Sequence, residues 1–118
     1  MPTLQETFDI VASHLLRQGR RSVDSEGRCL YRGPNGLKCG AGCLIPDELY
    51  DPDIEGRGVK CSEVEAVLDG HDLEVCRIGQ LIHDTMPPKE WPDALAMYAD
   101  RLGLTFTPPQ PKAGHVQA

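Results

Sequence analysis

Three of the chain's five cysteines lie in one short stretch, residues 29–56, together with tyrosines, prolines and carboxylates. Thiolates are zinc ligands, and Cys29, Cys39, Cys43 and the later Cys61 could supply four of them. Structural zinc sites usually contain two closely spaced pairs of ligands, whereas only Cys39 and Cys43 are close here. We therefore expect reduced, inert thiols and no cofactor, with a zinc-stabilised binding module as an alternative.

Cys43 suggests a second kind of chemistry, because it follows a run of small residues, 40–42, in a predicted turn. A thiol nucleophile needs a base within hydrogen-bond reach, for which the candidates are His14, His71 and His83. The glycines in this run have a second explanation, which is a close approach of two backbone segments. A small cysteine-dependent enzyme therefore stays an alternative, and a non-enzymatic protein is the expectation.

The acidic loop that follows resembles the first half of a calcium-binding EF-hand loop. Asp51, Asp53 and Glu55 alternate before Gly56, as the first ligands of that loop do. The twelfth position, which should be a bidentate glutamate, is Ser62. The spacing therefore favours an acidic surface loop.

Charge is distributed unevenly along the 118 residues, whose net charge is −6. Residues 17–38 contain six basic side chains and two acidic ones, whereas residues 47–74 contain ten carboxylates and two basic side chains. An acidic protein is a poor general binder of nucleic acid, because phosphate contacts need a basic face. The acidic block instead predicts either a solvated face or a surface that docks on a basic partner.

Apolar periodicity and capping residues predict four helices. The first covers residues 4–18, with a capping box at Thr3 and Glu6 and a stop at Gly19. The others are expected at 62–68, 72–84 and 90–102, the first of these with a capping box at Ser62. Phe8 and Trp91 begin apolar stripes and should be buried.

A small β-hairpin is expected between the first two helices. Residues 28–32 and 36–39 flank a turn at 33–36 that contains Gly, Pro and Asn. A helical turn is expected at 45–50. The predicted fold is thus α+β, a mostly helical single domain over 1–106, followed by a flexible tail over 107–118 whose sequence has no periodicity.

No apolar run approaches the length of a membrane span, and the first residues lack the pattern of a secretory signal. A cytoplasmic location is therefore expected, with no membrane partner. The oligomeric state does not follow from the sequence.

The stretch 29–56 resembles the core of a family of small phage and prophage proteins. The shared motifs are a Cys-x-Tyr-Arg-Gly turn at 29–33, Gly-Leu-Lys-Cys at 36–39 and Gly-Cys-Leu-Ile-Pro-Asp-Glu-Leu-Tyr at 42–50. The resemblance extends to the first helix, to an Ile-His-Asp helix and to a last helix that begins with Trp91. It implies an accessory protein that binds and blocks a host protein in the host cytoplasm, as anti-CRISPR and other anti-defence proteins do.

The acidic block could then imitate nucleic-acid phosphate on a host protein that itself binds nucleic acid. The residues expected to contact this partner are Asp47, Glu48, Tyr50, Asp51, Asp53, Glu55, Arg32 and Lys38.

Overall fold

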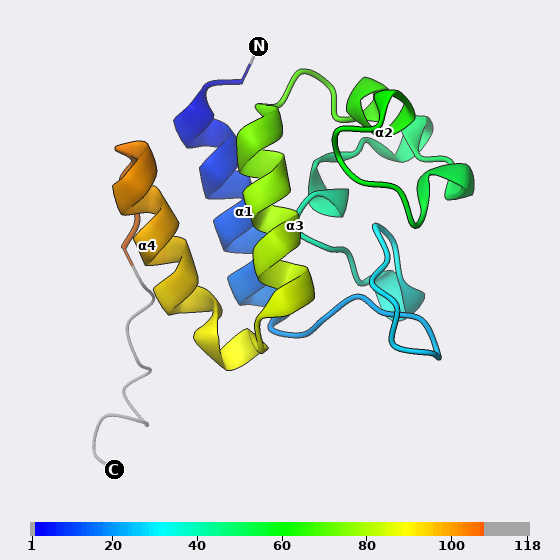
Figure 1. The fold of residues 1–118 in the computed structure, drawn as a ribbon, viewed down its shortest axis with the longest axis horizontal. Coiled ribbons are helices and arrows are strands. Elements are labelled where there is room, and N and C mark those ends of the chain that lie inside the picture. Colours follow the sequence, from blue (N-terminus) through cyan, green and yellow to red (C-terminus); the bar gives the residue numbers. More distant parts are fainter. Residues whose placement is uncertain (1, 108–118) are drawn as a thin grey trace.

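The computed structural model describes residues 2–107. Within them lie four α-helices: α1 (Leu4–Gln18), α2 (Ser62–Val67), α3 (Leu73–Thr85) and α4 (Trp91–Leu102). Figure 1 shows α1, α3 and α4 side by side, with α2 and the irregular chain at the other end of the long axis. We call α1, α3 and α4 the helical layer, and residues 20–68 the irregular half. Short 3-10 helices lie at Pro34–Gly36, Gly42–Leu44, Asp47–Leu49, Pro52–Ile54 and Pro88–Glu90.

The ends of the long helices follow the predicted capping signals. Thr3 Oγ1 accepts the Glu6 N–H at 3.0 Å while Glu6 Oε1 accepts the Thr3 N–H at 2.8 Å, which completes the capping box of α1. Gly19 and Gly103 end α1 and α4 in the left-handed conformation, with φ of 67° and 70°. The box predicted at Ser62 is not formed, since Cys61 is the N-cap of α2 and the Ser62 hydroxyl donates to Glu63.

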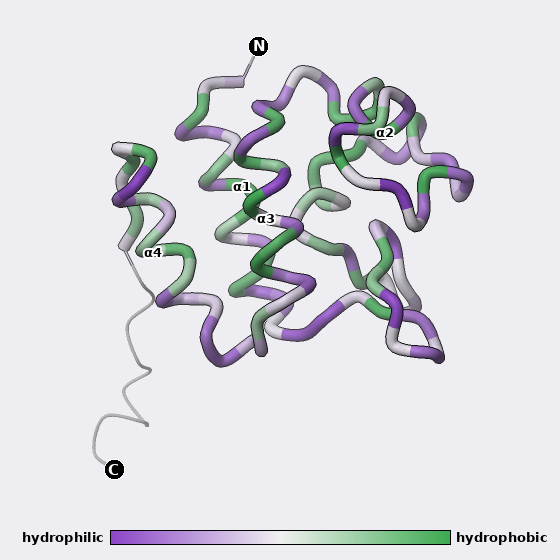
Figure 2. The backbone as a smooth tube through the Cα atoms, viewed as in Figure 1, coloured by the Kyte–Doolittle hydropathy of each residue, from purple (hydrophilic) through white to green (hydrophobic). Residues whose placement is uncertain are grey.

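The helical layer is held together by the apolar stripes of its three helices. Apolar residues recur along each of them (Figure 2). Phe8 and Trp91 are both buried, as predicted, and each buried apolar side chain of this size stabilises the fold by roughly 1.5–3 kcal/mol. The buried faces comprise Phe8, Val11, Ala12 and Leu15 of α1, Val75, Cys76, Ile78 and Ile82 of α3, and Trp91, Ala94, Leu95 and Ala99 of α4.

The predicted β-hairpin is wrong, and over residues 2–107 the fold is all-helical without strands. Arg32 and Lys38 pair across the turn only as an isolated antiparallel bridge. The Gly33 N–H donates to the Leu37 carbonyl at 2.8 Å, but on the other side of this pair the ladder stops, because the Tyr31 N–H donates to Glu55 and the Cys39 carbonyl accepts the Cys43 N–H. Side chains also bind the outward-facing groups of Arg32 and Lys38. Glu55 accepts the N–H groups of Tyr31 and Arg32 at 2.8 and 3.1 Å. Gln18 bonds both the N–H and the carbonyl of Lys38, at 2.9 and 2.8 Å.

Two glycines allow the irregular half to pack directly on the helical layer. A Cβ atom on Gly40 would lie 2.2 Å from the backbone oxygen of Gly79 in α3. A Cβ atom on Gly79 would lie 2.7 Å from Val11 Cγ1 of α1. Only glycine allows such a close approach, so the small-residue run before Cys43 has a structural explanation. We call the contact between Gly40 and Gly79 the glycine seam.

Buried side chains of the two halves belong to one continuous apolar core. The irregular half contributes Tyr31, Leu44, Ile54, Val64 and Leu68, among others. In residues 2–107, no helix has the length and apolar character needed to cross a bilayer. The tail predicted over 107–118 lies, except for Thr107, outside the described residues.

Candidate functional site

Four of the carboxylates predicted to bind a partner are exposed: Asp47, Glu48, Asp51 and Asp53. The Asp47 side chain is 84% exposed although its Oδ1 lies 2.7 Å from Arg32 Nη2. Asp51 Oδ1 accepts the Asp53 N–H at 2.9 Å and so caps a 3-10 helix. The exposed Asp47–Arg32 ion pair contributes little to stability. All four carboxylates are accessible to a partner because their side chains are exposed.

Three other predicted binding residues have internal roles. Besides the two N–H groups described above, Glu55 accepts the Tyr50 hydroxyl at 2.6 Å. The Arg32 guanidinium lies 4.7 Å from the centre of the Tyr50 ring and donates to the Ile45 carbonyl at 2.9 Å. Glu55, Tyr50 and Arg32 therefore hold residues 47–55, which we call the acidic segment, in place.

Two of the exposed carboxylates, Asp51 and Asp53, line a groove of about 450 Å³ between the acidic segment and α2. Its apolar lining consists of Leu49, Ile54, Ala66 and Val67. Its polar lining consists of Asp51, Asp53, Glu63 and Arg57. We call it the acidic groove. It combines an apolar surface with negative charge, which is a suitable combination for binding another protein.

Lys38, the last predicted binding residue, lines a different cavity beside α1, of about 410 Å³. Cys43 and His14, two of the residues of the cysteine-dependent alternative, line the same cavity. Burial raises the pKa of Cys43 to about 12, and its thiol donates to the Gly40 carbonyl. His14 Nε2 donates to the Lys38 carbonyl at 2.9 Å. The two residues thus share a cavity, but the thiol is protonated at neutral pH and is a poor nucleophile.

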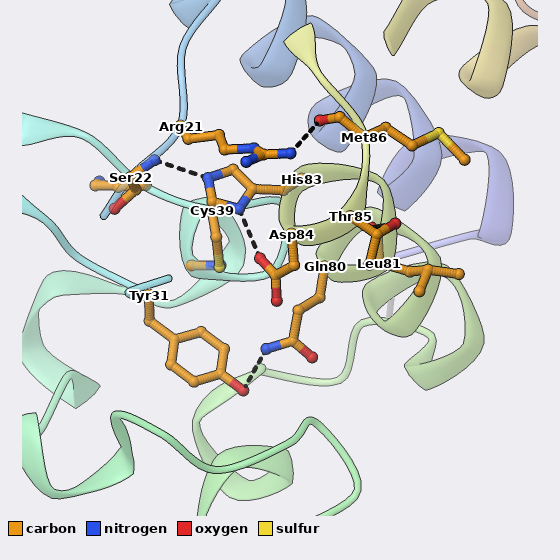
Figure 3. A network of polar contacts seen from close by, with 12 residues as sticks. Arg21, Ser22, Tyr31, Cys39, Gln80, Leu81, His83, Asp84, Thr85 and Met86 are labelled. Carbon is orange, nitrogen blue, oxygen red and sulfur yellow. Dashed lines mark hydrogen bonds and ion pairs between the residues drawn. The ribbon is translucent and has the colours of Figure 1, made fainter. Parts of the chain in front are cut away.

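His83, another candidate base, lies in a buried hydrogen-bond network (Figure 3). Its Nε2 accepts the Ser22 backbone N–H at 2.8 Å, so the ring proton is on Nδ1, which donates to Asp84 at 2.7 Å. Its ring stacks on Trp91, with centroids 5.8 Å apart. Both ring nitrogens are occupied, which leaves His83 without a lone pair for a general base. His71 lies elsewhere, hydrogen-bonded to Thr7 of α1.

Cys29, His83 and Asp84 place one ligand atom each within 4.8 Å of one another, as a metal site requires. The hydrogen bonding of His83 opposes a metal there. A metal on Nδ1 would move the ring proton to Nε2, where it would face the Ser22 N–H. Burial and the nearby Asp84 carboxylate also raise the pKa of Cys29 to about 11. The three residues are better explained as a structural network.

Cys29 and Asp84 line a third cavity, of about 270 Å³, with Tyr31 and Gln80. Gln80 Nε2 donates to the Tyr31 hydroxyl at 3.0 Å (Figure 3). That hydroxyl donates to the Arg57 carbonyl. These bonds connect α3 to the irregular half.

The four cysteines considered as zinc ligands lie in different surroundings. Cys29 adjoins Asp84, Cys43 adjoins α1, and Cys39 is buried, where its sulfur accepts the Gly42 N–H. Cys61 lies at the start of α2 and donates to Glu63 at 2.9 Å. Among the described residues, these four sulfurs do not form a cluster with metal-ligand spacing.

Comparison with protein-family models, with curated proteins and with solved structures finds no match. The apolar part of the acidic groove was missed in the sequence analysis. Leu49 lies within the acidic segment, where an exposed apolar residue between carboxylates could have drawn attention. Ala66 and Val67 are distant from Leu49 in the sequence and line the groove with it only because of where α2 lies in the fold.

Proposed function

We propose that this chain is a non-enzymatic, phage-type accessory protein that binds a host protein through its acidic surface and inhibits or redirects it. The observation that carries the proposal is the exposure of Asp47, Glu48, Asp51 and Asp53, the last two of which line a groove that also has an apolar lining. Complementary charge of this kind accelerates encounter and selects partners. The resemblance of residues 29–56 to phage proteins supports a host target in the host cytoplasm, with an anti-defence role such as anti-CRISPR activity.

The cysteine-dependent alternative is less well supported. A nucleophile must be thiolate at working pH, and burial raises the pKa of Cys43 to about 12. Gly40 is required by packing at the glycine seam, and Gly42 by the Tyr31 carbonyl, which an added Cβ atom would overlap. The burial of Cys43 and the packing of the glycines are therefore explained by the fold, without a catalytic role.

Affinity capture from a bacterial host lysate, with identification by mass spectrometry, tests the proposal. The test variant neutralises the exposed acidic surface with Asp47→Asn, Glu48→Gln, Asp51→Asn and Asp53→Asn. A matched control neutralises four exposed carboxylates elsewhere on the surface: one in α1, one just before α4 and two in α4. Its substitutions are Asp9→Asn, Glu90→Gln, Asp93→Asn and Asp100→Asn. A third variant is Cys43→Ser.

We expect the wild type, the control and Cys43→Ser to capture the same host protein, and the acidic-surface variant to lose it. Binding should also weaken as the salt concentration rises, because exposed charges are screened. Capture that survives neutralisation of the acidic surface would contradict the proposal. Loss of capture in Cys43→Ser alone would contradict the proposal and favour a cysteine-dependent enzyme.

A further inference from the structure

The acidic groove contains an apolar surface that charge attraction alone does not explain. Leu49 is 40% exposed, one of three large apolar side chains with this degree of exposure in the described residues. It lies in the groove with Ile54, Ala66 and Val67, whereas Ile10 and Met97 lie on α1 and α4. Apolar surface in a concave site gains free energy when a partner's apolar group removes it from water.

The charged residues that line the groove restrict which residues can flank the partner's apolar group. Three carboxylates, Asp51, Asp53 and Glu63, line it together with a single cation, Arg57. Arg57 is held in place, since its Nε donates to the Asp53 carbonyl at 3.0 Å and its Nη1 lies 3.9 Å from Glu63. A hydrogen bond from the Cys61 thiol helps to lower the pKa of Glu63, which keeps this carboxylate ionised at neutral pH.

We infer that the acidic groove binds one apolar side chain, of about the size of leucine, from a partner segment that carries Lys or Arg on both sides of it. This inference rests on the proposed function and names the chemistry of the partner. The apolar side chain would supply most of the affinity as a buried anchor, while the flanking cations would pair with the carboxylates and exclude acidic partners.

Three short synthetic peptides with a fluorescent label test the inference. The first has a central leucine between lysines and arginines, the second has alanine in place of leucine, and the third keeps leucine but has glutamates as flanking residues. Fluorescence anisotropy measures their affinity for the full chain. We expect the first peptide to bind at least about tenfold more tightly than either of the others, because each lacks one of the two required features.

Variants of the protein assign the binding to the groove. Ala66→Gln should occlude the apolar surface without changing the charge, and its control is Ser13→Gln on an exposed position of α1. Asp53→Asn removes one charge of the groove, and its control is Asp100→Asn on α4. The groove variants should weaken binding of the leucine peptide, by about tenfold for Ala66→Gln, and the controls should not. Thermal unfolding would verify that all four variants remain folded.

The outcomes separate this inference from the proposed function. Equal affinity for the leucine and alanine peptides, with dependence on Asp53, would overturn the apolar anchor and leave acidic docking in place. Tight binding of the glutamate-flanked peptide would overturn the basic character of the partner. Absence of binding to all three peptides would also overturn the inference, whereas the proposed function fails only if host capture survives neutralisation of the acidic surface.

Discussion

The helical layer and the irregular half of this molecule hold their backbones in different ways. In α1, α3 and α4 the backbone is satisfied by its own helical hydrogen bonds, and apolar stripes decide how the helices pack. In the irregular half, polar side chains from distant residues bind the backbone. Gln18 bonds both backbone groups of Lys38, and Glu55 accepts two consecutive N–H groups. The backbone groups of an extended segment outside any sheet can therefore still be hydrogen-bonded, provided that suitable side chains reach them.

This difference predicts that the helical layer is most sensitive to loss of apolar volume. Trp91→Ala should lower the free energy of unfolding by about 3–5 kcal/mol, because Trp91 is fully buried between α4 and His83 of α3. Denaturant unfolding followed by circular dichroism measures the change. Met97→Ala on an exposed position of the same helix is the control and should change stability by less than about 0.5 kcal/mol. Similar midpoints for the two variants would show that apolar packing does not dominate this layer.

The irregular half should instead be sensitive to loss of one acceptor. Glu55→Ala leaves the N–H groups of Tyr31 and Arg32 and the Tyr50 hydroxyl without their partner, at a cost of roughly 1–3 kcal/mol. Glu55→Gln keeps one acceptor oxygen and should fall between the wild type and Glu55→Ala. Urea titration of both, with the exposed Glu65→Ala as control, measures the effect. If Glu55→Ala unfolds like Glu65→Ala, these bonds do not organise the segment.

The smallest effect is expected from pH, through His14 of α1 and through His71, which is hydrogen-bonded to α1. Burial lowers the pKa values of His14 and His71 below their ordinary value of 6.5. The unfolded chain therefore takes up protons first as the pH falls. Their contribution to stability is present above about pH 6.5 and is lost as the pH falls through the lower pKa values of the fold.

Unfolding free energies at pH 7 and pH 5 measure this loss. The double variant His14→Gln, His71→Gln should show a shallower decrease between the two pH values than the wild type. Several carboxylates, including Glu6 and Glu74, have pKa values lowered from 4.5 and titrate below this window. An unchanged slope in the double variant would show that the two rings are not responsible.

The difference between the helical layer and the irregular half also explains which features could be predicted from the sequence. Thr3, Gly19 and Gly103 give local signals for helix ends, and the four helices were predicted to within one or two residues. The hairpin was wrong because the Tyr31 N–H, which would extend its ladder, instead donates to Glu55, 24 residues away in the sequence. Pattern and propensity describe neighbours in sequence and contain no information about such partners.

The candidate site was also predicted only in part, because its residues have partners that are distant in the sequence. Composition predicted the acidic surface, but it did not separate the exposed Asp51 and Asp53 from Glu55, whose carboxylate is used internally. The structural network around His83 and Asp84 also depends on Ser22, which precedes His83 by 61 residues. These roles depend on tertiary contacts, which charge counting does not detect.

The glycine seam has a consequence for the dynamics of the irregular half. Residues 39–45 have only short 3-10 structure, yet the backbone at Gly40 lies against Gly79 of α3 with no space for a side chain between them. Detaching this segment would expose Cys39, Ala41, Leu44 and Ile45, all of which are buried. Its amide hydrogens, such as those of Leu44 and Ile45, should therefore exchange with solvent as slowly as those of the long helices, because they become accessible only when the whole domain opens.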